Sequence, residues 1–292
     1  MNKVNELFAI PTGLEPVVLS GVKFFTSDNL KNSFKIAFSK SSKGNHIVPE
    51  IEKLIDSNIV IPCFKSKNIL SFLKNKIFND NKYIVAYYDI DAKRVVVIID
   101  NNISIFGTAS NNELASTTMH ECMHLATGRN LSKFMSIFLP YLVSYYSEFF
   151  KDYFSLKNVD KKKILDIIKY LVNFERKGPR YANTKLNEYY KLIYELFKDD
   201  TEYNDQQFQS LLTNMIVALK LFIVNMNALV KNAQNFSMIF TSLNRAYFNA
   251  FGEKNNYTTP IQELSGLSEV ACVLAEMKPK DPVIKKLFGI ID

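Results

Sequence analysis

The pattern of hydrophobic and polar positions changes at about residue 107. Before that point lie short runs rich in Val, Ile and Tyr, and such runs favour pleated, half-buried β-strands. The clearest are 17–25, 59–63 and a β-hairpin over 83–100. Apolar residues at helical spacing are found at 47–56 and 67–78. This part of the chain therefore predicts a small mixed or antiparallel sheet with a few helices.

After Gly128 the chain has helical periodicity almost throughout. Pro140 is expected to kink the first of these helices, and Lys177-Gly-Pro-Arg180 is expected to separate two others. The expected helices are 132–155, 160–176, 183–198, 205–231, 236–251, 259–277 and 282–288. The pattern predicts the α+β class and one domain over 1–292, with a mixed α/β part at 1–107 and a helical part at 108–292.

Signals at both ends and along one face predict a helix at about 111–127. Ser110 and Glu113 form an S-x-x-E capping box, whose side chains bond the free amides of a first helical turn. Gly128 stands where a C′ glycine would end the helix. One face is a small apolar stripe suited to burial, formed by Ala115, Met119, Cys122 and Ala126. The other face carries Glu113, Thr117, His120 and His124.

The segment His-Glu-Cys-Met-His at 120–124 uses two of the three histidines of the chain. Residues four positions apart lie on one face of a helix, so His120 and His124 can reach a single metal ion. Glu121 lies one step around the helix, close enough to take a proton from a metal-bound water. Cys122 lies about 200° around the helix from His120, so it is expected to pack and not to bind metal.

A sheet that leads into an H-E-x-x-H helix, over about 83–128, resembles the core of the zincin metallopeptidases. The resemblance implies that His120 and His124 hold a zinc ion with a third protein ligand, and that Glu121 is the catalytic base. Thr127 and Asn130 stand where the extended metzincin pattern has Gly and His, so this branch is not indicated. A downstream glutamate is the natural third ligand, as in the gluzincin branch.

Glu269 is the preferred third ligand because its surroundings resemble the gluzincin pattern E-x-A-[D/N]-x-[F/L]-A. Ala271, Leu274 and Ala275 match that pattern. Cys272 stands in place of the acidic or amide residue that, in this pattern, contacts a metal-ligating side chain. A T-x-x-Q capping box at 259–262, with Pro260 at the first helical position, predicts the helix that carries Glu269.

Glu148 is the second candidate for the third ligand. With Asp152 it matches a looser E-x-x-x-D pattern, and it lies in a strongly aromatic stretch. A solvent-facing Glu on an amphipathic helix explains Glu148 equally well. Glu188 and Glu263 are weaker alternatives, and Glu263 lies in a first helical turn, where a negative charge is favourable in any case.

Charge and cysteine usage narrow the class of partner. The net charge of +7 is carried by scattered lysines, and the longest run of them is 161–163, so a nucleic-acid partner is not expected.

The cellular location is indicated by cysteine usage and by the length of apolar stretches. Three separated cysteines without a C-x-x-C pair indicate a reducing compartment. The longest uncharged stretches, 134–147 and 206–219, are shorter than the ~20 residues that span a bilayer. With no secretion signal at the N-terminus, a cytoplasmic location is expected, and a virion is the other location considered.

The sequence therefore predicts a zinc-dependent peptidase that acts on a peptide or protein substrate. His120, His124 and Glu269 would hold Zn2+, and Glu121 would activate water and carry its proton to the leaving amine. A Tyr or Arg would stabilise the oxyanion, and Tyr181 and Tyr257, both expected in loops, are candidates. The alternative is a non-catalytic structural or binding protein, for example a viral one, that retains a zincin-like fold. The sequence leaves the oligomeric state open.

Overall fold

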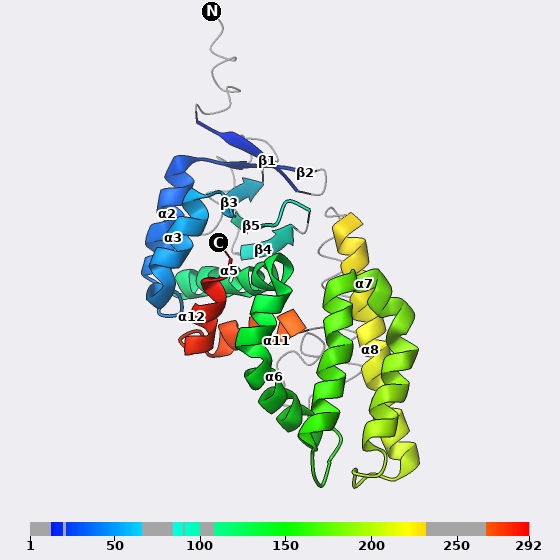
Figure 1. Cartoon of the computed structure of the whole chain (residues 1–292). Helices are drawn as coiled ribbons and strands as arrows, with labels where there is room; N and C mark the ends of the chain where they lie inside the picture. Colours follow the sequence, from blue (N-terminus) through cyan, green and yellow to red (C-terminus); the bar gives the residue numbers. More distant parts are fainter. Residues whose placement is uncertain are drawn as a thin grey trace, which may run out of the picture. The chain divides into compact units, whose positions relative to one another are not determined.

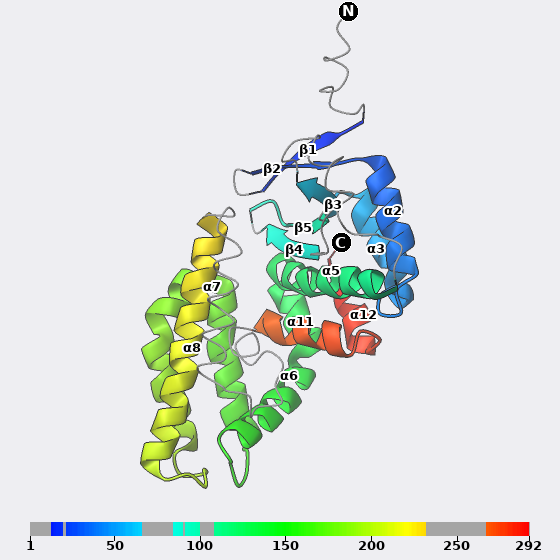
Figure 2. The same ribbon diagram turned by 180° about the vertical axis from the view of Figure 1, so that it is seen from behind.

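The computed structural model describes residues 13–19, 22–65, 84–89, 91–99, 108–231 and 267–291 (Figures 1 and 2). The chain divides into two compact units, Met1–Asn130 with Leu274–Asp292, and Leu131–Val273. The division falls inside one continuous helix, α11 (Leu267–Met277), which therefore contributes residues to both units. The single domain over 1–292 stays a prediction.

Within the described residues, the first unit contains five strands in the order β1-β2-β3-β5-β4. Only β3 and β5 are parallel, and the other neighbours are antiparallel. Two residue pairs alone join β2 to β3, so the β1–β2 hairpin and the three strands β3, β5 and β4 form two small ladders. The strands are β1 (Glu15–Leu19), β2 (Val22–Thr26), β3 (Val60–Lys65), β4 (Ile84–Asp89) and β5 (Arg94–Ile99).

Both faces of the sheet are packed. Val17, Leu19, Phe24, Ile61 and Val96 belong to a buried cluster on one face, against which Tyr87 also packs. Val95 and Val97 point to the opposite face, because side chains alternate along a strand, and both are fully buried. Helix α5 (Thr108–Arg129) contacts β4 and β5 (Figure 1). The sheet therefore provides a rigid support for α5.

Helices that lie between β2 and β3 in the chain, together with a helix near residue 285, also belong to the first unit. Helix α2 was not expected from the sequence, and Ser27 caps it by accepting a hydrogen bond from the amide of Leu30 at 3.2 Å. These elements are α2 (Asp28–Ser39), the 3-10 helix η1 (Asn45–Ile47), α3 (Val48–Asp56) and α12 (Pro282–Phe288). Helices α2 and α12 both contact α5, so α5 is the centre of this unit.

Both predicted ends of the H-E-x-x-H helix are wrong. The helix begins at Thr108, so Ser110 lies in its first turn and not before it. The helix continues through Gly128, whose backbone is not left-handed. A Cβ atom added at Gly128 would lie 2.2 Å from the hydroxyl oxygen of Tyr88 on β4. The glycine therefore permits close approach of a strand and does not end the helix.

The second unit is helical and has a strongly aromatic core. Phe150 and Phe197 lie with ring centroids 5.4 Å apart, and Phe154 and Phe208 with centroids 4.9 Å apart, which links three helices. These helices are α6 (Leu131–Tyr153), α7 (Lys161–Phe197) and α8 (Asp205–Lys231). Aromatic pairs of this kind stabilise a core beyond the area that they bury. Pro140 lies inside α6, which corresponds to the helix expected at 132–155 and is not split by the proline.

Helix α7 folds back on itself. The rings of Tyr170 and Tyr189 are stacked 5.4 Å apart, whereas 19 residues of straight helix would separate them by about 28 Å. The hydroxyl of Tyr170 also donates to the carbonyl of Lys185 at 2.8 Å. The chain therefore reverses between Tyr170 and Lys185, but α7 remains helical through 177–180, where a break was expected.

The α+β class and the helical C-terminal part are confirmed by the structure. In the described portion of the chain, no helix is long and apolar enough to cross a membrane. The helices expected at 67–78 and 236–251, and the cap at 259–262, lie outside the described residues.

Candidate metal centre

Helix α5 presents two histidines on adjacent turns. The rings of His120 and His124 lie with centroids 5.1 Å apart and planes at 68°. The apolar stripe that predicted burial of the opposite face is fully buried, namely Ala115, Met119, Cys122 and Ala126. Because that face packs inside the protein, the two imidazoles project together from the other side of the helix.

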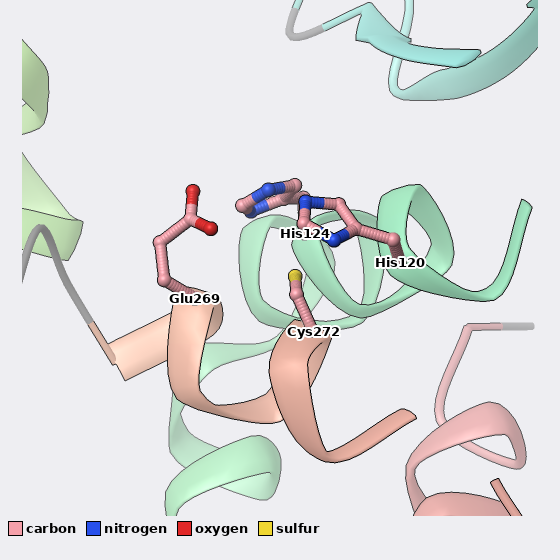
Figure 3. A group of neighbouring side chains, drawn as sticks. All are labelled: His120, His124, Glu269 and Cys272. Carbon is pink, nitrogen blue, oxygen red and sulfur yellow. The ribbon is translucent and has the colours of Figure 1, made fainter. Parts of the chain in front are cut away.

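Helix α11 brings Glu269 and Cys272 to these histidines. One ligand atom from each of the four residues lies within 4.8 Å of the others, and the group can hold a metal ion. In Figure 3 the carboxylate of Glu269 and the sulfur of Cys272 point from α11 toward the rings of His120 and His124. Glu269 is 6% exposed and Cys272 is fully buried. A carboxylate so deeply buried needs a charged or polar partner, and a cation would supply one.

Glu276 lies behind His120, a contact that sequence reasoning missed. Its Oε1 atom lies 2.8 Å from Nδ1 of His120. A carboxylate accepts a hydrogen bond, so the proton belongs on Nδ1 and the Nε2 lone pair remains for a metal. The gluzincin pattern has the residue for this contact at position 272, where this chain has a cysteine and the contact was in doubt. The signal that could have found it is the spacing, because Glu276 is two helical turns after Glu269 and lies on the same face.

Lys43 fixes the end of α11 that carries Glu276. Its Nζ atom donates to the backbone carbonyl of Glu276 at 3.2 Å and lies 3.3 Å from the hydroxyl of Ser116 on α5. The lysine thereby bridges the two helices close to His120. These contacts help to hold the Glu276 carboxylate close to His120.

Glu121 lies at the edge of the sheet and outside the four-residue group. Its Oε2 atom accepts a hydrogen bond from the backbone amide of Tyr88 on β4 at 2.8 Å. The side chain is partly exposed. Burial, and after it the negative charge of Glu121, raises the pKa of Tyr87 above its ordinary value. Glu121 is therefore held beside the metal-binding face as a charged group with its own partner.

The remaining sequence candidates lie elsewhere. Glu148 is exposed on α6, and Glu188 pairs with Lys185 on α7. His46, the third histidine of the chain and not a candidate from the sequence, lies in η1, where burial is the main cause that lowers its pKa. Tyr181, expected in a loop, is within α7, which corrects that expectation. Tyr257 and Glu263 lie outside the described residues.

Between two helices far apart in the sequence, the chain thus assembles two imidazoles, a carboxylate and a thiol. No protein-family model, curated protein or solved structure matches the chain. The function is therefore inferred from the chemistry of this group and of the residues around it.

Proposed function

We propose that the protein is a zinc-dependent peptidase of gluzincin type. The observation that carries this proposal is the convergence of His120 and His124 from α5 with the Glu269 carboxylate from α11. Two histidines and a glutamate are the ligand set of a known class of catalytic zinc site. The H-E-x-x-H spacing supplies the additional glutamate that such chemistry needs.

The donor chemistry and spacing fit zinc. Zinc is bound in proteins by nitrogen, oxygen and sulfur at about 2.0–2.3 Å, and tetrahedral geometry then places ligand atoms roughly 3.3–3.8 Å apart. The four ligand atoms lie within 4.8 Å of one another, so adjustments on the order of 1 Å would complete such a site. Glu276 provides the outer carboxylate that histidine ligands usually have.

Glu121 is the proposed general base. Zinc bound at this group would act as a Lewis acid and lower the pKa of water. Glu121 takes the proton of the attacking water and passes it to the nitrogen of the leaving amine. Its hydrogen bond to the Tyr88 amide fixes the orientation of the carboxylate beside the metal-binding face of α5. This geometry supports a base and not a fifth ligand.

Strand β4 is the proposed docking site for an extended peptide. Within the described residues β4 is the last strand of its sheet, with β5 on one side only. The Tyr88 amide bonds Glu121, so it points away from β5. Backbone groups alternate along an antiparallel strand, so those of Ala86 point the same way. A peptide that pairs with this edge would pass the Glu121 carboxylate.

The test compares wild type with Glu121→Gln on a peptide library, with zinc content measured in parallel. Glu121→Gln keeps the size of the side chain and removes its basicity, so hydrolysis should fall by about 10²–10⁴-fold while zinc is retained. Glu113→Gln is the matched control, because Glu113 is an exposed glutamate on the same helix. Equal hydrolysis by wild type and Glu121→Gln would refute the role of Glu121.

A structural zinc clamp is the second candidate function, and one observation favours it. Cys272 adds a fourth protein donor, and four protein ligands are typical of structural zinc sites. A protein of this kind would lose folding stability when a chelator removes the metal, and it would hydrolyse no peptide with or without substitutions. Chelator titration followed by circular dichroism, beside the peptide assay, separates the two functions.

A further inference from the structure

We infer that Cys272 is a fourth protein ligand and holds the metal centre in a closed resting state. This inference rests on the metal centre of the proposed function and adds its regulation. Cys272 is three residues after Glu269 on α11, so both side chains project from the same face of the helix. Its sulfur lies with the two imidazoles and the carboxylate inside the 4.8 Å group (Figure 3).

Cys122 provides an internal comparison. Neither cysteine forms a disulfide, both are fully buried, and both are in helices that contribute to the site. Cys122 lies between the two histidines in sequence but on the opposite face of α5, and it is absent from the group of four described ligand residues. The two thiols are therefore distinguished by the helix face on which they lie, and not by burial.

Thiol chemistry determines what Cys272 does when the ion binds. A thiol that coordinates zinc is deprotonated, so binding forms one metal–sulfur bond and releases the thiol proton to solvent. Together with His120, His124 and Glu269 this gives four protein ligands. A four-coordinate site with protein ligands alone has no position for water, so this state cannot support hydrolysis by Glu121.

The closed state can open without loss of the other ligands. Departure of the thiolate breaks the metal–sulfur bond, and the sulfur takes back a proton from solvent. Cys272 has one side-chain torsion between its backbone and its sulfur, whereas Glu269 is held independently on the same rigid helix. The remaining ligand set, two histidines and a glutamate, is that of a catalytic zinc site with an open position.

The test replaces zinc by cobalt(II) in the full-length protein and records the absorption spectrum. Cobalt bound by a thiolate has a sulfur-to-metal charge-transfer band in the near ultraviolet. The band is expected in wild type and in Cys122→Ala, and it should be absent from Cys272→Ala and Cys272→Ser. Circular dichroism verifies that the variants are folded, and Cys272→Ser retains the size of the side chain. A band that persists in both Cys272 variants would overturn the ligand assignment.

Azide tests closure of the site separately. It should change the cobalt spectrum of Cys272→Ala, which has an open position, and leave that of wild type unchanged. An equal change in both proteins would show that the wild-type site is open and would overturn the closed state. Peptide hydrolysis by zinc-loaded Cys272→Ala should exceed that of wild type. If both spectra behave as expected and neither protein hydrolyses peptide, the closed four-ligand site is confirmed and the peptidase function fails.

Discussion

Helices α5 and α11 each contribute two residues to the candidate metal centre, yet they do so in different ways. Helix α5 supplies two identical potential ligands, His120 and His124, at a spacing that any α-helix places on one face. Helix α11 supplies two chemically different potential ligands, Glu269 and Cys272, and then Glu276 behind His120. Helix α5 is supported by β4 and β5, and its position is fixed by the sheet.

This comparison separates the features of the candidate metal centre that one helix provides alone from those that need two packed helices. The histidine pair needs only helix formation and is therefore a local property of five residues. The ligands of α11 become a site only after that helix packs beside α5. The choice of a third ligand, the presence of a fourth and the orienting carboxylate all depend on this second helix. Substitutions in the two helices can separate these contributions.

The largest loss of zinc affinity is expected for His124→Ala, which removes a ligand from α5. Structural zinc sites bind with about 10–16 kcal/mol, so one ligand of four represents roughly 2.5–4 kcal/mol, or about 10²–10³-fold in affinity. Isothermal titration with zinc measures the loss. His46→Ala is the control because His46 lies in η1, and it should bind zinc as wild type does. Undiminished affinity of His124→Ala would contradict the site.

Glu269→Ala tests the contribution of α11 and chooses between the two third-ligand candidates. We expect zinc affinity to fall by about 10²-fold, at the lower end of the range for one ligand, because Cys272 remains on the same helix. Glu148→Ala should leave affinity unchanged, since Glu148 is exposed on α6. The reverse order of the two effects, measured by competition with a chromogenic chelator, would transfer the ligand assignment to Glu148.

A smaller loss is expected for Glu276→Gln. The amide keeps the size of the side chain but loses the negative charge that orients His120, and outer partners of this kind usually contribute 10–100-fold in affinity. Zinc titration provides the measurement. Glu113→Gln on α5 is again the matched control, because it is exposed. The hydrogen bond has no role in metal binding if both variants retain wild-type affinity.

The last prediction concerns the support that β4 gives to α5. Gly128→Ala places a methyl group against the Tyr88 hydroxyl, so the free energy of unfolding should fall by about 1–3 kcal/mol. Tyr88→Phe removes the closest atom, and the same glycine substitution should then cost less. Urea denaturation of the four proteins in this double-mutant cycle measures the coupling. Strictly additive effects would show that the contact does not restrict the helix.

Local signals predicted much of the fold. The hairpin over 83–100 and the helices at 205–231 and 282–288 follow from alternation, helical spacing and a proline at a helix start. Helix α2 was missed because its sequence is largely polar and its burial depends on partners far away in the chain. Gly128 was misread because a C′ glycine and a glycine at a tight contact are identical in sequence.

The candidate site likewise contains residues that the sequence predicted and residues that only the structure revealed. The His120–His124 pair could be read from the sequence, and so could the preference for Glu269, through a pattern on a second helix. From the sequence, Cys272 was only a departure from the family pattern, whereas the structure places its sulfur among the potential ligands. The spacing of Glu276 after Glu269 was a signal that the sequence analysis did not use, whereas Lys43 left no signal, because a hydrogen bond between distant segments produces no local pattern.

Local sequence patterns were sufficient for the hairpin over 83–100, for most of the described helices and for the chemistry of the H-E-x-x-H face, because helix and strand periodicity act over a few residues. Only the tertiary structure decided which residues of α11 reach that face. It also decided that β4 lies beside Glu121 and that a thiol accompanies the carboxylate. These outcomes depend on packing between segments separated by most of the chain, and such packing is a property of the whole buried core.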